Sequence, residues 1–148
     1  MLKFDSIMVP TDFSKQFFIA LDYAKEMARS LGSKLHILHC IESTLMPSDM
    51  VFPANAKLVD VEQEVERNAK EKLQSIKESL EAEGHNVVTS IKKGNPAAEI
   101  VKYATEEDVG MICISTHGAN GLEHFIFGST TEKVLRTAKC PVFAVKLP

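Results

Sequence analysis

Two glycines and three hydroxyl side chains lie close together near the carboxyl end of the sequence. Gly118 and Gly128 bracket nine residues, and Gly128 leads directly into Ser129, Thr130 and Thr131 at the start of a helical pattern. The first N–H groups of a helix lack partners within the helix and carry partial positive charge, so they stabilise an anion. Hydroxyls add hydrogen-bond donors, and glycine leaves room for a ligand beside the backbone. The pattern is therefore typical of a phosphate-binding stretch.

A second interpretation of the same stretch needs no ligand. Ser129 and Glu132 fit the S-x-x-E capping box, in which side chains of the protein satisfy the first N–H groups of the helix. Asn120 and Gly121 form an ordinary turn pair. The residues alone support capping and phosphate binding about equally. The sequence contains neither G-x-x-x-x-G-K-[ST] nor G-x-G-x-x-G after its first strand, which disfavours conventional P-loop hydrolysis.

Short apolar runs alternate with helical periodicity along the chain. Pro10 has no N–H to donate to a neighbouring strand, so we expect the first strand to end before it. Ser14 is suited to cap the first helix and Gly32 to end it, while Asn95 followed by Pro96 is typical of a helix start. We predict strands at 6–9, 34–41, 86–91, 111–115 and 141–145, and helices between Ser14 and Gly32, over 58–80, over 97–105, and from Ser129 onward.

This alternation predicts the architecture. Consecutive strands joined by a helix need a long crossover and therefore pair in parallel, and right-handed crossovers place helices on both faces of the sheet. We predict an α/β fold, a doubly wound sandwich with a five-stranded parallel sheet and helices on both faces. Because the chain has 148 residues, 45% of them hydrophobic, and no linker or repeat, residues 1–148 are expected to form a single domain.

Charge and composition exclude several classes of function. Seventeen basic and twenty acidic residues give a net charge of -3, so no strong positive field draws the protein to nucleic acid. No apolar run approaches the roughly 18 residues of a membrane span, and we expect a cytoplasmic protein with neither a membrane nor a nucleic-acid partner. Cys40, Cys113 and Cys140 show no C-x-x-C spacing, which argues against zinc or a redox dithiol. We expect His85 and His124 at the surface.

Ligands of doubly wound sheets bind beyond the carboxyl ends of the strands, where the strand order reverses. Here those ends are followed by Pro10, Thr11 and Asp12, by the residues after Cys40, and by residues 115–131. If the first and fourth strands are neighbours across the reversal, two of these loops form the walls of one crevice. Asp12 is suited both to contact a ligand and to form an Asx turn that caps the first helix, and the sequence supports the two roles equally.

The chain resembles the universal stress protein family over nearly its whole length. "IMVPTDFS" is similar to the opening strand and loop of that family, "LHILHCIE" to its second strand, "GNPAAEIVKYA" to its third helix, and "GSTTEKVLRTAKCPVFAV" to its closing helix and strand. Nucleotide-binding members carry G-x2-G-x9-G-[ST], and Gly118, Gly128 and Ser129 match the last two-thirds of this motif. Ser115 stands where the first glycine belongs, and a side chain there would crowd the ligand if the position needed a positive φ.

The resemblance implies a set of nucleotide-binding residues. Asp12 would lie near the ribose or near a phosphate-bound magnesium ion, and Cys40 would present its backbone to adenine. The residues around the two glycines would surround the phosphates. The implied nucleotide-binding set is Pro10, Thr11, Asp12, Cys40, Ser115, His117, Gly118, Gly128, Ser129, Thr130 and Thr131.

The resemblance also implies a function. The leading hypothesis is a stress-response protein that binds ATP or AMP, with magnesium, and acts as a nucleotide-regulated dimeric binding module rather than as an enzyme. A slow magnesium-dependent ATPase is one alternative, disfavoured because no motif places a general base. A nucleotide-free homodimer that acts through protein contacts is another. The dimer would form through the edge strand 142–145, whose apolar edge would otherwise invite uncontrolled pairing.

Overall fold

The structure is a computed structural model and describes residues 2–42, 58–117 and 128–147. In these ranges strands and helices alternate as predicted, with bounds that agree with the sequence pattern to within two residues. The elements are β1 (Ser6–Thr11), α1 (Lys15–Leu31), β2 (Lys34–Ile41), α2 (Leu58–Ala82), β3 (Val87–Lys93), α3 (Pro96–Glu106), β4 (Met111–Ser115), α4 (Ser129–Thr137) and β5 (Val142–Val145).

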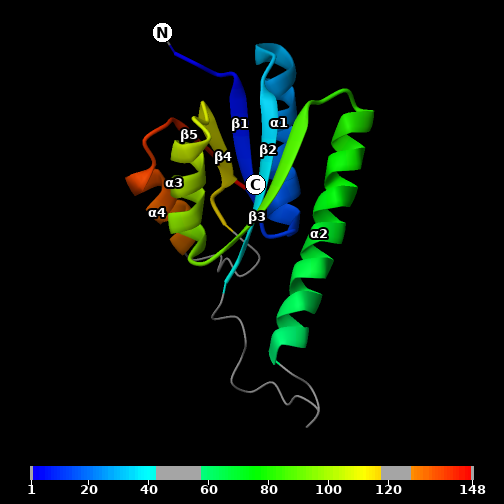
Figure 1. Cartoon of the computed structure of the whole chain (residues 1–148). Helices are drawn as coiled ribbons and strands as arrows, with labels where there is room; N and C mark the ends of the chain where they lie inside the picture. Colours follow the sequence, from blue (N-terminus) through cyan, green and yellow to red (C-terminus); the bar gives the residue numbers. More distant parts are fainter. Residues whose placement is uncertain (1, 43–57, 118–127, 148) are drawn as a thin grey trace.

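The strands form one parallel sheet in the order β3-β2-β1-β4-β5. The chain first runs outward from β1 through β2 to β3, and then returns to β4 and β5 on the other side of β1. The strand order therefore reverses between β1 and β4. Helices α1 and α2 cover one face of the sheet, and α3 and α4 cover the other (Figure 1). The predicted doubly wound α/β sandwich is confirmed.

Two apolar cores fix these layers. Successive residues of β1 point to opposite faces, so Ile7 and Val9 join the core beneath α1 and α2, whereas Met8 joins the core beneath α3 and α4. Leu73 of α2 and Ile100 of α3 cover the sheet from opposite sides, and all five side chains are buried. Full burial of a side chain of this kind contributes roughly 1.5–3 kcal/mol. The sheet is thus held between its helices by apolar contacts on both faces.

Strand β1 is paired unequally on its two sides. Against β2 it is paired along its whole length, Ser6–Thr11. Within the described residues, its pairing with β4 is limited to Ile7 and Met8. Pro10 lies inside the strand, so the prediction that the strand ends before it was wrong. The proline is accommodated because β4 has already separated from β1 at this position, and its missing N–H breaks no ladder bond to β4.

The predicted helix ends are confirmed for α1 and α3. The Ser14 hydroxyl accepts a hydrogen bond from the Phe17 N–H at 3.3 Å, and Gly32 ends α1 with a left-handed φ of 69°. The side chain of Asn95 accepts from the Ala98 N–H at 3.1 Å, and Pro96 follows as the first residue of α3. Both helices therefore satisfy part of their first turn with their own side chains.

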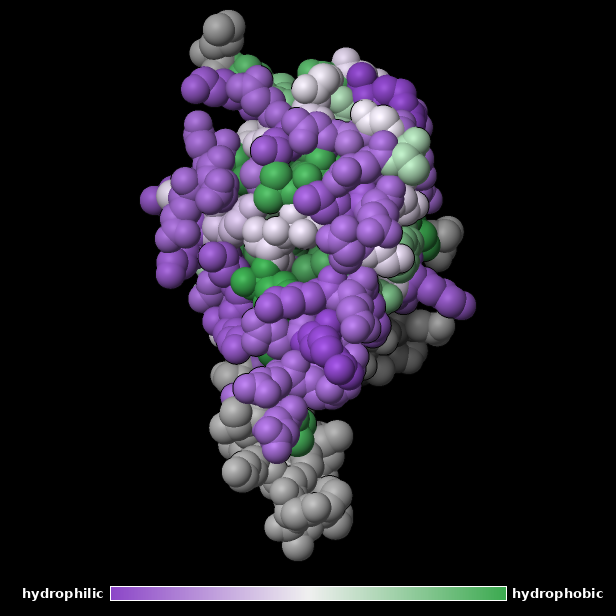
Figure 2. Space-filling view, turned by 45° about the vertical axis from the view of Figure 1, so that its right-hand side comes forward, coloured by the Kyte–Doolittle hydropathy of each residue, from purple (hydrophilic) through white to green (hydrophobic). Residues whose placement is uncertain are grey.

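The outer face of α2 is strongly polar. Figure 2 shows a mainly hydrophilic surface on this side of the molecule, with hydrophobic side chains visible between the polar ones. Ion pairs three or four residues apart run along the helix: Glu64–Arg67, Glu66–Lys70 and Lys77–Glu81. Exposed pairs of this kind contribute little to stability, so the apolar stripe of α2 does more to hold it against the sheet. None of the described helices is long and apolar enough to cross a membrane.

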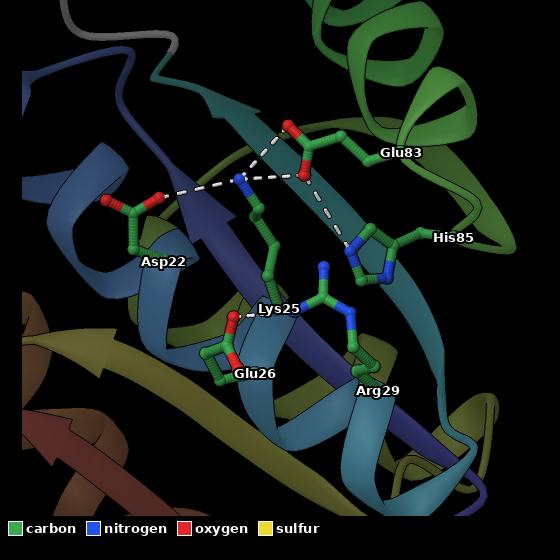
Figure 3. A network of polar contacts seen from close by, with 6 residues as sticks. All are labelled: Asp22, Lys25, Glu26, Arg29, Glu83 and His85. Atoms are coloured by element: carbon green, nitrogen blue, oxygen red, sulfur yellow. Dashed lines mark hydrogen bonds and ion pairs between the residues drawn. The ribbon is translucent and has the colours of Figure 1, made fainter.

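A polar network ties α1 to the end of α2 (Figure 3). Lys25 Nζ lies 2.9 Å from Glu83 Oε2 and 3.6 Å from Asp22 Oδ1, and the Glu83 contact is the main cause of a raised pKa of Lys25. The His85 ring points toward Glu83, with Nε2 3.9 Å from Oε2. Its side chain is only 6% exposed, so the prediction that His85 lies at the surface was wrong. The turn folds back on α2, where the His85 N–H donates to the Leu80 carbonyl. The predicted surface position of His124 lies outside the described residues.

Candidate functional site

A pocket of about 460 Å³ opens at the carboxyl edge of the sheet, where the strand order reverses. Its volume lies in the range of small-molecule and cofactor sites. Residues at the ends of β1, β2 and β4 and at the starts of α3 and α4 line it. The described lining residues are Pro10, Thr11, Asp12, Phe17, Leu38, His39, Cys40, Glu42, Pro96, Ile100, Ile114, Ser115, Gly128, Ser129, Thr130 and Thr131.

The loop between β1 and α1 forms one wall of the pocket. The Thr11 hydroxyl accepts a hydrogen bond from the Phe13 N–H at 2.9 Å. Asp12 Oδ1 accepts from the Ser14 N–H at 3.0 Å and also from the Ser14 hydroxyl, which is an Asx turn. Asp12 is nevertheless exposed and lines the pocket. The two roles that the sequence supported for this carboxylate, turn formation and ligand contact, are geometrically compatible.

The start of α4 forms the opposite wall. Its N-cap is Gly128 in an extended conformation, with φ -68° and ψ 156°, and no side chain makes a cap hydrogen bond there among the described residues. The predicted capping box was wrong because Ser129 is already the first helical residue. Glu132 pairs with Arg136 instead, and its N–H donates to the Gly128 carbonyl at 3.0 Å. The first N–H groups of α4 therefore lie at the pocket wall, and no side chain of the described ranges caps them.

Short hydrogen bonds fasten the end of β4 to α4. The Thr131 hydroxyl donates to the Ser115 carbonyl at 2.7 Å, and the Ser115 hydroxyl donates to the His117 carbonyl at 2.7 Å. The Gly128 N–H donates to the Thr116 carbonyl at 2.6 Å. Both Thr131 and Ser115 are buried. The Thr131 hydroxyl thus ties α4 to the sheet, and the Ser115 hydroxyl holds the residues that directly follow β4.

The remaining hydroxyls of α4 are more accessible. Ser129 is exposed and Thr130 is half-buried, and both line the pocket. Ser115, which replaces a glycine of the family motif, is not among the described residues with a positive φ. Its backbone therefore adopts an ordinary conformation, and its side chain is turned to the His117 carbonyl. These positions leave Ser129 and Thr130 as the hydroxyls best placed to meet a ligand.

Cys40 lies at another part of the pocket, at the end of β2. Its Sγ is half-buried and lies 4.0 Å from the Pro96 carbonyl. Burial, with additional effects of Glu99 and Glu42, raises the pKa of the Cys40 thiol to about 12. The side chain is therefore a neutral thiol near pH 7 and a poor nucleophile. Cys40 can therefore contribute to a binding site through the shape of its side chain and through its backbone N–H and carbonyl groups.

The apolar lining of the pocket was not predicted from the sequence. Leu38, Ile100 and Ile114 are buried and line it beside Cys40. The alternation of a strand puts Leu38 and Cys40 on one face of β2, so the pattern contained a signal for Leu38. Ile100 comes from α3, and its position depends on how that helix packs. Glu42 lies just beyond β2, among the residues after Cys40 that were expected at the ligand-binding edge, but it was not among the predicted binding residues.

Nine of the eleven residues predicted to bind nucleotide line this one pocket, all except His117 and Gly118. His117 is not among the lining residues, and its Nδ1 lies 3.1 Å from the Thr116 hydroxyl. Gly118 lies outside the described residues. Within the described ranges, no group of three or more His, Cys, Asp or Glu side chains could hold a metal ion. A metal at this site would need oxygens from a ligand as well as from Asp12.

The sequence can be compared with known families. It matches the model of the universal stress protein family over residues 3–146. The universal stress protein MJ0577 of Methanocaldococcus jannaschii is 32% identical over 154 aligned residues, which cover 97% of this chain and 95% of that relative. The universal stress protein YxiE of Bacillus subtilis is 29% identical and covers 97% of this chain and 99% of its own.

Solved structures show the same architecture. The structure of MJ0577, described as a structure-based assignment of the biochemical function of a hypothetical protein, has a TM-score of 0.84 at 31% identity, with 98% of this chain and 97% of that chain covered. A universal stress protein from Archaeoglobus fulgidus, solved in complex with dAMP, has a TM-score of 0.67 at 24% identity, with 99% and 100% covered. At 24% identity, the similarity to this second structure shows a common fold.

Proposed function

The chain belongs to the universal stress protein family, and we propose that it binds an adenine nucleotide, ATP or AMP, in the pocket at the carboxyl edge of the sheet. In this proposal the nucleotide controls a dimeric binding module that takes part in a stress response. The observation that carries it is the start of α4, which lines the pocket and has no side-chain cap among the described residues. A phosphate group is the ligand that such a helix start favours.

The pocket offers separate groups for the two parts of a nucleotide. The N–H groups at the start of α4 and the hydroxyls of Ser129 and Thr130 supply donors for phosphate oxygens. Leu38 and Ile100 supply apolar contacts for a base, and the adjoining backbone at Cys40 supplies polar groups for its edge. The solved dAMP complex of a protein with this fold makes an adenine nucleotide the first ligand to test.

The charge of the pocket favours a divalent cation with the nucleotide. The described lining residues include the carboxylates of Asp12 and Glu42 and no lysine or arginine. A triphosphate beside two carboxylates needs additional positive charge. Magnesium binds through one or two carboxylates together with phosphate oxygens and water, and exposed Asp12 fits that requirement. Asp12 would hold the ion, and the ion would neutralise phosphate charge.

The direct test is the small-molecule content of the purified protein, measured by mass spectrometry after denaturation and followed by calorimetric titration with ATP and AMP. We expect adenine nucleotide near one per chain, or binding on titration that strengthens with magnesium. A protein that carries no nucleotide and gives no heat with either ligand would contradict the proposal.

A variant can then locate the phosphate. Gly128 has a φ of -68°, which valine adopts readily, so Gly128→Val should fold while its side chain fills the start of α4. We expect a loss of ATP affinity of about a hundredfold or more, comparable with the loss of two charge-assisted hydrogen bonds. Thr137→Val, at the other end of the same helix, is the matched control and should bind as the unchanged protein does. Unchanged affinity in Gly128→Val would place the phosphate elsewhere.

The proposed homodimer would form through β5, an edge strand of the sheet. Phe143 on this strand is 39% exposed, and its ring centroid lies 6.1 Å from that of Tyr23, which is also exposed. An apolar edge strand is a template for pairing with a second copy. Sedimentation should show a dimer that Phe143→Glu converts to monomer. Phe18→Glu changes a phenylalanine of α1 that is 45% exposed and serves as the control. A monomeric unchanged protein would refute the dimer.

Slow ATP hydrolysis is a second candidate, and the position of Glu42 favours it. This carboxylate lines the pocket together with Asp12, so the site holds a possible metal ligand and a possible water-orienting group. Release of phosphate from ATP that is lost in Glu42→Gln, with ATP affinity retained, would establish the enzyme. Absence of any release above the spontaneous rate would leave a binding protein.

A further inference from the structure

Phe13 has an unusual backbone beside the pocket. It directly follows Asp12, and its φ of 63° lies in the left-handed region. Bulky residues rarely adopt this conformation, and where they do, surrounding contacts must hold them there. Among the described residues one other non-glycine position, Asp108, has a positive φ, and short polar side chains tolerate it better than aromatic ones do.

Two contacts from outside the loop hold the Phe13 ring. The His39 ring of β2 lies with its centroid 4.5 Å from that of Phe13 and its plane tilted by 36°. Lys72 Nζ, from α2, lies over the same ring at 5.2 Å from its centroid, within the range of cation–π contacts. The ring is also packed against the core beneath α1 and α2. Phe13 is thus where β2, α2 and the β1–α1 loop meet.

The same contacts lead to the pocket. The Phe13 N–H donates to the Thr11 hydroxyl, and the next N–H along the chain donates to the Asp12 carboxylate. His39 Nδ1 lies 2.8 Å from the Thr11 carbonyl. Thr11, Asp12 and His39 line the pocket, whereas Phe13 and Lys72 are not among its described lining residues. The turn at Phe13 therefore sets the direction in which Asp12 is presented.

We propose that Phe13 is a positioning residue of the nucleotide pocket: its ring, in contact with His39 and Lys72, keeps the β1–α1 loop in the left-handed turn that presents Asp12 to the ligand. Through Lys72 the position of α2 then influences the affinity of the pocket. This inference rests on the proposed function, because the ligand is taken to be an adenine nucleotide. It assigns an effect on binding to two side chains outside the pocket.

The first experiment measures ATP affinity by calorimetry, with magnesium. Phe13→Tyr keeps the ring and should bind as the unchanged protein does, whereas Phe13→Leu should bind about tenfold more weakly. Lys72→Met should bind about two- to fivefold more weakly, the value of one exposed cation–π contact. Lys77→Met, which removes the same charge elsewhere on α2, should have no effect. Wild-type affinity in Phe13→Leu would overturn the proposal.

A double variant separates positioning from simple attraction between Lys72 and the phosphates. If Lys72 acts through the ring, Lys72→Met has no further effect once Phe13→Leu is present. An equal effect in both backgrounds would mean that the lysine charge attracts ATP directly, and the proposed link through Phe13 would be wrong. Thermal unfolding of every variant checks that each is folded at the temperature of the titration.

Amide hydrogen exchange of the ligand-free protein tests the loop without any nucleotide. The N–H groups of Phe13 and Ser14 should exchange faster in Phe13→Leu and in Lys72→Met, and at the unchanged rate in Lys77→Met. If the unchanged protein binds no ATP, the proposed function fails, while this measurement still decides whether Phe13 and Lys72 hold the loop. Unchanged exchange in both variants would overturn the positioning role.

Discussion

The starts of α1 and α4 both lie at the pocket, but they are completed differently. In α1 the hydroxyl of Ser14 stands one residue before the helix, caps the Phe17 N–H and is itself fixed to Asp12. In α4 the corresponding position is Gly128, and the hydroxyl of Ser129 is already inside the helix. The position of a hydroxyl relative to the first helical residue, more than its presence, therefore decides whether a helix start is satisfied internally. Of these two helix starts, only that of α4 has no side-chain cap within the part of the chain that the structure describes, and it is the one open to a ligand's charge.

The strongest test of this difference between the two helix starts introduces a side-chain cap at the start of α4. Gly128→Asp adds a side-chain oxygen at the N-cap and a negative charge where phosphate is proposed. We expect ATP affinity to fall by about 3 kcal/mol, since the variant removes at least one charge-assisted contact and adds repulsion. The melting temperature should stay the same or rise, because aspartate is a favourable N-cap. Retained affinity in a calorimetric titration would show that the α4 start is not used.

The next largest effect concerns the carboxylate at the other wall. Asp12→Asn keeps an oxygen that can accept from the Ser14 N–H, so the turn should persist, but it removes the charge that would hold magnesium. We expect ATP binding to weaken by about 1.4 kcal/mol and to lose most of its dependence on magnesium. Asp22→Asn, on the outside of α1, is the control. A full magnesium response in Asp12→Asn would place the metal on another group.

Removing a side-chain cap from α1 or α3 should lower the free energy of unfolding more than it lowers the affinity for ATP. Ser14→Ala deletes the hydroxyl that caps α1 and should lower the free energy of unfolding by about 1 kcal/mol. Asn95→Ala, at the start of α3, should cost about the same amount. Urea unfolding of the two variants measures both values. An unchanged free energy of unfolding in Ser14→Ala would mean that the Ser14 hydroxyl does not stabilise the start of α1.

A change of pH should alter the stability of the protein less than the substitutions above do, and it acts through His36. His36 is buried beneath α3, with Nδ1 2.8 Å from the Tyr103 hydroxyl. Burial, helped by Lys34, lowers the pKa of His36 below its ordinary value of 6.5 in the folded protein, although Glu107 acts in the opposite direction. Between the two pKa values the unfolded chain binds more protons. Stability is therefore full above pH 6.5 and falls as the pH decreases through that value.

This pH dependence can be assigned by comparing melting temperatures of the unchanged protein and of His36→Gln between pH 5 and 8. The variant should lose less stability on acidification, because glutamine does not titrate. Parallel curves would show that another group is responsible. His36 lies at neither helix start. The ATP affinities of variants at the starts of α1 and α4 are therefore best compared above pH 6.5, where His36 does not change the stability.

Much of the fold was predictable from local patterns. Runs of apolar residues gave the strands, periodicity gave the helices, and Ser14, Gly32 and Asn95 marked ends that the structure confirms. These signals are local, since a cap or a periodic stripe depends on residues within a few positions of each other. The parallel pairing followed from the rules for crossovers rather than from particular residues, whereas the adjacency of the first and fourth strands entered only as a condition.

Two of the misjudged or missed features depend on neighbours that are distant in sequence, and a third depends on where a helix begins. Pro10 lies within β1 because β4 has already separated from that strand, a fact about pairing. The S-x-x-E pattern fits Ser129 and Glu132, but the helix begins one residue too early for it to form. The apolar lining from Ile100 depends on how α3 sits on the sheet. The hydroxyls and glycines therefore predicted the polar part of the pocket and not its apolar lining.

The sheet order leaves two outer strands, β5 and β3. In a dimer built on β5 about a twofold axis, both copies use the same surface. The β5 edge of each copy is then covered and cannot bind a third chain. The β3 strands then lie at the far ends, and each carries Lys92 and Lys93 at its carboxyl end. Lys93 is paired with Glu66 of α2 at 3.1 Å, and charged side chains of this kind on an edge strand discourage edge-to-edge addition of further copies. Growth would stop at two chains, and a filament would not form.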